Sequence, residues 1–178
     1  QSGKALYVGI SNYDAEQTRV AHRVLADMGV PLLIHQPRYN MFDRRMEDGL
    51  LDALAELELG SIVFSPLAQG LLTNRYLDGV PAGSRASEGR WISEDNIDDS
   101  YLERARALNV IAETRGQSLA QLALLWVLRH PQVTSALIGA SSVRQLDNSL
   151  DALDAPALTA DELAAIEPHA VRGTGSKP

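Results

Sequence analysis

The chain has 178 residues, of which 45% are hydrophobic and 22% charged, and these values predict one globular domain with its own core. Its net charge of −7 argues against a nucleic acid or a membrane surface as partner, because both require a basic face on the protein. The chain has no cysteine, which excludes a disulfide framework and thiolate chemistry and leaves the cytoplasm as the default compartment. We expect no metal site, because the four histidines lack metal-ligand spacing.

The first third of the chain alternates between apolar runs and amphipathic stretches. Residues 5–10 form a short apolar run that predicts a strand, and Asp14 with Gln17 has the pattern of a capping box that begins a helix. Gly29 supplies the left-handed residue that commonly ends a helix. A second strand at residues 31–34, a leucine-rich helix and a third strand at 61–64 repeat the unit. Because the first strand lies so near residue 1, we expect further chain before it.

The remainder of the chain begins with a polar stretch, residues 65–98, whose length is typical of a functional lid or a disordered segment. Two helices are expected next, at residues 101–115 and 118–129. A fourth strand follows at residues 134–138, and its helix covers residues 143–153. The capping box of Thr159 and Glu162 predicts a last helix that ends near His169, and we expect residues 171–178 to be a disordered tail.

Four apolar strands that are each followed by an amphipathic helix predict a parallel sheet with helical crossovers. The pattern leaves two architectures about equal: a doubly wound sheet, and a (β/α)8 barrel to which the chain would contribute four strands. A self-contained flavodoxin-like domain belongs to the first of these. In either architecture a ligand lies beyond the carboxyl ends of the strands.

Polar and aromatic side chains stand at those strand ends. Asn, Gln and Ser side chains at three of them could hydrogen-bond a carboxamide, and Phe64 could stack on a flat ring. After the fourth strand, the small residues 139–142 open a helix whose free backbone amides could bind a phosphate. An ordinary N-cap at Ser141 or Ser142 explains these small residues equally well.

An ordered series of motifs resembles that of the aldo/keto reductases. Residues 3–12 are similar to the GKxxxxGxSN strand and turn of that family, and residues 36–40, QPRYN, to the end of its next strand. Residues 65–73, SPLAQGLLT, resemble its SPLxxGLLTG motif, and residues 116–128 and 138–146 complete the series. The resemblance is nearest to the branch with the potassium-channel beta subunits and bacterial glyceraldehyde-phosphate-type reductases.

The resemblance implies an α/β fold in which residues 1–170 supply the C-terminal half, strands five to eight, of a TIM (β/α)8 barrel. It also implies an oxidoreductase that transfers hydride from NADPH to a small aldehyde or ketone. The family's catalytic Tyr, Lys, Asp and His belong to the first half of the barrel, and the chain contains neither an Asp-x-Ala-x-x-Tyr nor a His-x-x-Asp pattern. We therefore assign no catalytic residue and expect the chain alone to be inactive. The alternative is a non-catalytic nucleotide-binding module that senses redox state or binds a partner.

The resemblance further implies which residues bind NADP. Three polar residues at the first two strand ends would hold the nicotinamide carboxamide, and Phe64 would stack on its ring. Arg75 stands where the family often has a phosphate-binding lysine, and Arg85 resembles an arginine of the lid loop. Ser141 and Gln145 would meet the 2′-phosphate. The predicted cofactor-binding residues are Ser11, Asn12, Gln36, Phe64, Ser65, Pro66, Leu67, Ala68, Gln69, Arg75, Arg85, Gly139, Ser141, Gln145 and the pair Asn148 and Ser149, which replaces a Glu-Asn pair of the family.

The histidines are expected to be structural. His35 adjoins Gln36, but strand alternation turns the two side chains to opposite faces, so we interpret His35 as a core or interface residue. We expect His22, His130 and His169 to be solvated on helix surfaces or ends.

Four strands alone cannot close a barrel. The apolar faces that hold Leu6, Val8, Leu33, Ile62 and Leu137, or their alternating neighbours, therefore need a cover. We expect that cover to be the N-terminal half of the barrel, present as another chain, or a second copy of this chain in a homo-oligomer.

Overall fold

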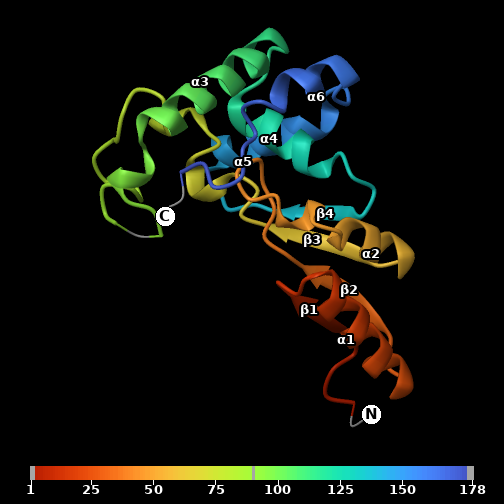
Figure 1. Ribbon diagram of the computed structural model, residues 1–178. Helices are drawn as coiled ribbons and strands as arrows, with labels where there is room; N and C mark the ends of the chain where they lie inside the picture. Colours follow the sequence, from red (N-terminus) through yellow and green to blue (C-terminus); the bar gives the residue numbers. More distant parts are fainter. Residues whose placement is uncertain (1–2, 90, 176–178) are drawn as a thin grey trace.

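The computed structural model describes residues 3–89 and 91–175, and these form an α/β arrangement around one four-stranded parallel sheet (Figure 1). The strands are β1 (Val8–Ser11), β2 (Leu32–Gln36), β3 (Gly60–Phe64) and β4 (Val133–Leu137). They lie side by side in the order β1-β2-β3-β4, which is their order in the sequence. A doubly wound sheet reverses its strand order at a switch point, whereas a (β/α)8 barrel does not. The sheet is therefore consistent with part of a barrel.

Six α-helices and five short 3₁₀ helices connect and cover the strands in the described part of the chain. The α-helices are α1 (Ala15–Asp27), α2 (Leu50–Glu56), α3 (Asp99–Thr114), α4 (Leu119–Leu128), α5 (Val143–Leu150) and α6 (Ala160–Ile166). The 3₁₀ helices are η1 (Arg45–Glu47), η2 (Ala68–Gly70), η3 (Asn74–Tyr76), η4 (Glu94–Asn96) and η5 (Asp151–Asp154). None of the helices in these residues has the length and apolar character needed to span a membrane.

The predicted helix ends are confirmed where a local signal specifies them. Capping boxes begin α1 at Asp14 and α6 at Thr159, and Gly29 follows α1 with a φ of 68°. The first strand begins later than expected, at Val8, which pairs with Leu32. Residue 31 before that partner is a proline, which cannot donate to the ladder, and this explains why β1 does not extend toward Leu6.

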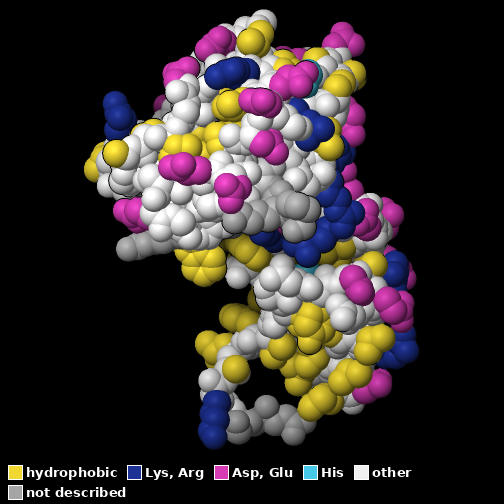
Figure 2. All heavy atoms as spheres, turned by 60° about the vertical axis from the view of Figure 1, so that its left-hand side comes forward, with side chains coloured by type: hydrophobic (Ala, Val, Ile, Leu, Met, Phe, Trp, Pro, Cys, Tyr) yellow, Lys and Arg dark blue, Asp and Glu magenta, His cyan; other side chains and the backbone are white. Residues whose placement is uncertain are grey.

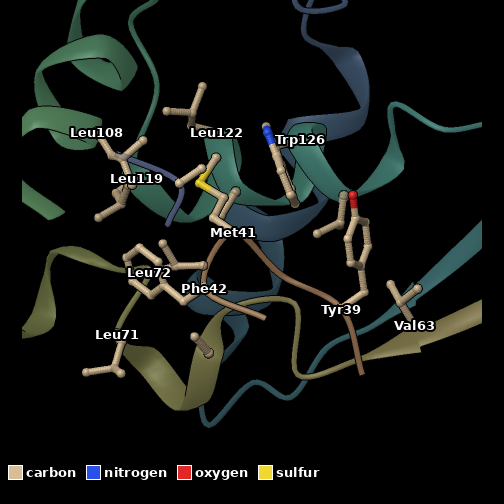
Figure 3. Close-up of a cluster of buried hydrophobic side chains, with 14 of the residues drawn as sticks. Tyr39, Met41, Phe42, Val63, Leu71, Leu72, Leu108, Leu119, Leu122 and Trp126 are labelled. Carbon is tan, nitrogen blue, oxygen red and sulfur yellow. The ribbon is translucent and has the colours of Figure 1, made fainter. Parts of the chain in front are cut away.

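The core lies on the side of β3 and β4 that faces α3 and α4 (Figure 3). Trp126 of α4 is its largest buried side chain; the ring of Tyr39 lies 5.2 Å from it, and the guanidinium of Arg129 lies 3.6 Å from its ring centroid. Tyr101 of α3 donates a 2.9 Å hydrogen bond from its hydroxyl to the carbonyl oxygen of Leu71. These contacts anchor the segment after β3, so the core fixes the turn that lies at the carboxyl edge of the sheet.

Residues 171–175, within the tail that we expected to be disordered, pack against the domain. The backbone N–H of Gly173 donates to the carbonyl oxygen of Phe42 at 3.0 Å, and Arg104 donates to the hydroxyl of Thr174 at 2.8 Å. Asn96 donates to the carbonyl oxygen of Gly175 at 2.9 Å. The structure differs from the expectation here because partners far away in the sequence hold this segment. Residues 176–178 lie outside the described residues.

Both outer strands of the sheet lack a further strand neighbour in the described residues. The lower part of the molecule holds β1, α1 and β2, and Figure 2 shows hydrophobic side chains gathered on it. Leu6 is 89% exposed and Leu33 is 49% exposed, while Leu137 at the other edge is 54% exposed. Val8 and Ile62, the remaining residues for which we expected a cover, are half-buried. Apolar surface is thus open at both edges of the sheet.

Candidate functional site

A cavity of 1060 Å³ lies at the carboxyl ends of β3 and β4. Its walls are the turn after β3, the beginning of α4 and the segment from the end of β4 into α5. Twelve of the sixteen residues that the sequence predicts for cofactor binding line it: Phe64, Ser65, Pro66, Leu67, Gln69, Arg75, Arg85, Gly139, Ser141, Gln145, Asn148 and Ser149. The structure therefore brings together side chains that are up to 85 positions apart in the sequence (149 − 64).

The turn after β3 has an uncommon backbone. Ser65, Ala68 and Gln69 have φ values of 53°, 47° and 60°, in the left-handed region that residues other than glycine seldom occupy. Each such residue costs on the order of 1–3 kcal/mol and persists only where the surroundings impose it. Here the Nε2 of Gln69 donates to the Oγ of Ser65 at 3.1 Å. Strain of this kind is typical of a functional site, because it holds backbone groups in a chosen position.

The start of α5 forms the opposite wall. Ser142 is the N-cap, and its Oγ accepts a hydrogen bond from the backbone of Gln145 at 3.3 Å. Ser141 is not the cap; its backbone N–H and its hydroxyl both donate to the Oε1 of Gln145, each at 2.9 Å. The Gln145 oxygen is thereby occupied, and its Nε2 remains a donor without a partner in the described residues.

The charged side chains that line the larger cavity are all positive among the described residues. Arg75, Arg85 and Arg144 line it, and none of the described lining residues is acidic, although the whole chain carries a net charge of −7. Arg144 also stands in the first turn of α5, where the helix dipole disfavours a cation unless an anion balances it. Arg144 was not among the predicted residues, although a basic residue two positions after a cap-like serine was an available signal. The arrangement suits a ligand with several negative charges.

Three predicted residues lie at the ends of β1 and β2, outside the lining of this cavity. Ser11 pairs with Gln36 in the parallel register, and its hydroxyl donates to the Gln36 carbonyl oxygen at 2.7 Å. Asn12 has a φ of 56°, and its Oδ1 accepts a hydrogen bond from the backbone of Arg38 at 3.1 Å. The structure thus brings Ser11, Asn12 and Gln36 together as one group on the same edge of the sheet.

A second cavity, of 450 Å³, lies along the segment after β2 and has none of its described lining residues in common with the first. Ala68, which the sequence places among the cofactor-binding residues, is buried and lines this smaller cavity rather than the larger one. The backbone N–H of Tyr39 donates to the carbonyl oxygen of Phe64, and the Nδ2 of Asn40 donates to that of Ser65 at 2.9 Å. These bonds join the walls of the two cavities.

His35 is a core residue, as predicted. It is fully buried, its Nε2 accepts a hydrogen bond from the backbone of Tyr13 at 3.2 Å, and burial lowers the pKa of His35 to about 4. His22, His130 and His169 lie on a helix or just after one, as expected, but they are half-buried and thus less exposed to solvent than expected. Burial and, second, the charge of Arg129 lower the pKa of His130. No group of His, Asp and Glu that could hold a metal ion occurs in the part of the chain that the structure describes.

The fold and the site define an α/β protein that presents a cation-lined cavity at the carboxyl edge of a parallel sheet. The chain belongs to the aldo/keto reductase family, whose sequence model matches residues 1–170. Over 178 residues it is 46% identical to L-glyceraldehyde 3-phosphate reductase of Escherichia coli K12, with 97% of this chain and 51% of that protein covered. It is also 35% identical, over 171 residues, to a probable voltage-gated potassium channel subunit beta of Oryza sativa subsp. japonica, with 93% and 52% covered. The chain thus spans about half the length of the curated relatives it matches.

Proposed function

We propose that this chain is the NADP-binding half, strands five to eight, of a (β/α)8 barrel enzyme that reduces small aldehydes or ketones. Membership of the aldo/keto reductase family and the sequential order of four parallel strands support this assignment. The coverage of about half of each relative supports it as well. The bacterial relatives are L-glyceraldehyde 3-phosphate reductases, and this supports a small aldehyde as substrate of the whole protein.

The observation that carries the proposal is the composition of the larger cavity. Three arginines and no acidic residue among its described lining match the charge of a dinucleotide, which bears a pyrophosphate and, in NADP, a 2′-phosphate. Its volume of 1060 Å³ lies at the upper end of the range for ligand sites. The side chains present therefore fit the group.

In the proposed complex each wall of the larger cavity binds a different part of the dinucleotide. Arg75 and Arg85 would neutralise the pyrophosphate beside the strained turn after β3. Ser141, Arg144 and Gln145 would hold the 2′-phosphate, since the Gln145 Nε2 and the first turn of α5 supply donors there. The half-buried ring of Phe64 offers a flat surface for the nicotinamide. Ser11, Asn12 and Gln36 would orient its carboxamide.

When bound, the cofactor supplies a hydride to the carbonyl carbon. The carbonyl oxygen must gain a proton, and we assign no acid for this step within the described residues. The open apolar edges at β1 and β4 indicate a covering partner, which we propose is the other half of the barrel. A second copy of the chain is the alternative cover.

A second candidate function is a nucleotide-binding module that senses redox state or binds a partner. It rests on the similarity to the rice protein and on a relative in Schizosaccharomyces pombe, a putative voltage-gated potassium channel subunit beta that is 33% identical over 160 residues. Under this candidate the same cavity binds the nucleotide, and carbonyl reduction is not its role.

The rate of NADPH oxidation with a simple aldehyde, measured on the full-length protein that carries this chain, separates the two candidates. Saturable turnover that falls in an Arg75→Met, Arg85→Met double variant supports the reductase. Tight NADPH binding without turnover of any aldehyde or ketone in a broad panel supports the module. Absence of NADPH binding contradicts both.

A further inference from the structure

The smaller cavity contains one cation and no acid among its described lining residues. Its volume of 450 Å³ is within the range for small-molecule sites. It combines the apolar side chains of Phe42, Leu71 and Ile92 with the guanidinium of Arg38. Arg38 belongs to the QPRYN motif, residues 36–40, and is not among the predicted cofactor-binding residues.

The carboxylate nearest to Arg38, that of Asp43, is already paired with Arg45. The Asp43 carboxylate accepts two hydrogen bonds from Arg45, both at 2.8 Å. The Nε of Arg38 lies 3.4 Å from the same carboxylate, and this buried nitrogen has no hydrogen-bond partner in the described residues. Burial acts to raise the pKa of Asp43, but hydrogen bonds and charge from Arg45, together with the charge of Arg38, outweigh it and lower that pKa. Two cations thus share one anion, which leaves a net positive charge at the cavity.

The other polar side chains around the cavity are satisfied. Asn40 is fully buried; it donates to Ser65 and accepts from the backbones of Phe42 and Asp43. The amide of Asn96 bonds to Ser93 and to the carbonyl oxygen of Gly175. A guanidinium in a concave site whose other polar groups are paired is the natural attachment point for an anion.

Arg38 also lies next to the larger cavity. Its backbone forms an isolated parallel bridge with Phe64, where the Phe64 N–H donates to Pro37 and the Tyr39 N–H donates to Phe64. Under the proposed function, Phe64 supports the reacting ring. A short molecule bound at Arg38 could therefore place its carbonyl beside the nicotinamide ring, on the face that Phe64 does not cover.

We infer that Arg38 is a specificity-determining residue that binds the anionic end, a phosphate or a carboxylate, of a short-chain carbonyl substrate in the smaller cavity. The inference rests on the proposed function and adds to it the class of substrate. The guanidinium forms charge-assisted hydrogen bonds with the anion while the apolar wall of the cavity excludes water.

The test compares three short aldehydes with the full-length protein and NADPH: glyceraldehyde, glyceraldehyde 3-phosphate and succinic semialdehyde. Arg38→Met should raise the KM for the two anionic aldehydes by about 10- to 100-fold and leave kcat/KM for glyceraldehyde within about twofold of wild type. Whichever anionic aldehyde shows the larger change identifies phosphate or carboxylate as the preferred group. Arg38→Lys should restore part of the affinity, since it keeps the charge but loses the forked geometry. The matched control is Arg19→Met, which removes an arginine of α1 that pairs with Glu56 of α2. It should change none of these values.

A second readout uses inorganic phosphate as inhibitor of glyceraldehyde reduction. Inhibition competitive with glyceraldehyde, but not with NADPH, and absent in Arg38→Met supports the site. An equal effect of Arg38→Met on charged and uncharged aldehydes, or inhibition competitive only with NADPH, overturns the inference while the reductase proposal stands. If no aldehyde is reduced by the wild-type protein, the proposed function itself fails.

Discussion

Arg85 and Gln69 form a hydrogen bond of 2.9 Å, from the Nη1 of the arginine to the Oε1 of the glutamine, in the lining of the larger cavity. Gln69 in turn donates to Ser65 in the turn after β3. The bond therefore connects the long segment after η3 to the most strained part of the carboxyl edge. It leaves further guanidinium donors of Arg85 for an anionic ligand.

We predict that NADPH orders the segment of residues 74–96. A pyrophosphate beside Arg75 and Arg85 adds charge-assisted hydrogen bonds to a segment that few regular elements hold, so local opening becomes rarer. Amide hydrogen exchange in this segment should slow by at least about tenfold with NADPH, and this change should be lost in Arg85→Met. Exchange that is equally slow with and without nucleotide would contradict the role of the segment as a lid.

The buried imidazole of His35 predicts a pH dependence of stability. The pKa of His35 in the folded state is about 4, against 6.5 in the unfolded chain, so the unfolded state binds the proton more readily between these values. The contribution of His35 is complete above about pH 6.5 and is lost as the pH falls toward about 4, by on the order of 3 kcal/mol.

Urea unfolding of His35→Gln and wild type at several pH values between about 7 and 4 checks this prediction. The difference in unfolding free energy between the two proteins should shift in favour of the variant as the pH falls, because glutamine keeps an acceptor for the Tyr13 N–H and does not titrate. His22→Gln on α1 is the control. A constant difference across the range would mean that His35 is protonated at little cost in the fold.

The open edges predict poor solution behaviour of residues 1–178 by themselves. Leu6 and Leu33 near one edge and Leu137 at the other expose apolar surface, and β1 and β4 lack a further strand neighbour among the described residues. Such surfaces favour association. Light scattering should detect self-association or aggregation of the isolated chain. A monomer of 19.3 kDa that unfolds cooperatively would contradict the need for a covering partner.

Local signals made much of the fold predictable from the sequence. The capping boxes at Asp14, Ser118 and Thr159 mark helix starts because the side chain and the backbone that it caps are three residues apart. The parallel sheet followed from four apolar runs separated by amphipathic helices. The order of the strands in the sheet could not be predicted from periodicity, because periodicity carries no information on which strand edges meet.

The motifs identified most of the larger cavity because its walls are short contiguous segments at strand ends. Arg144 was missed, although a cation in the first turn of a helix is a readable anomaly. Two contacts could not be foreseen, since each depends on tertiary geometry. In one, Arg38 and Arg45 share the Asp43 carboxylate, and in the other Arg104 donates a hydrogen bond to Thr174. The partial burial of His130 could not be foreseen either, because it depends on packing near Tyr39, whose ring centroid lies 6.3 Å from that of His130.

The affinity of the full-length protein for NADPH and NADH tests the central claim most directly. If Ser141, Arg144 and Gln145 hold a 2′-phosphate, NADPH should bind more tightly than NADH by on the order of 1.5 to 3 kcal/mol. An Arg144→Met, Ser141→Ala double variant should remove most of that difference, while Arg19→Met should retain it. Fluorescence quenching gives the four dissociation constants needed for each comparison. Equal constants for NADPH and NADH in the wild-type protein, or no binding of either nucleotide, would contradict the account.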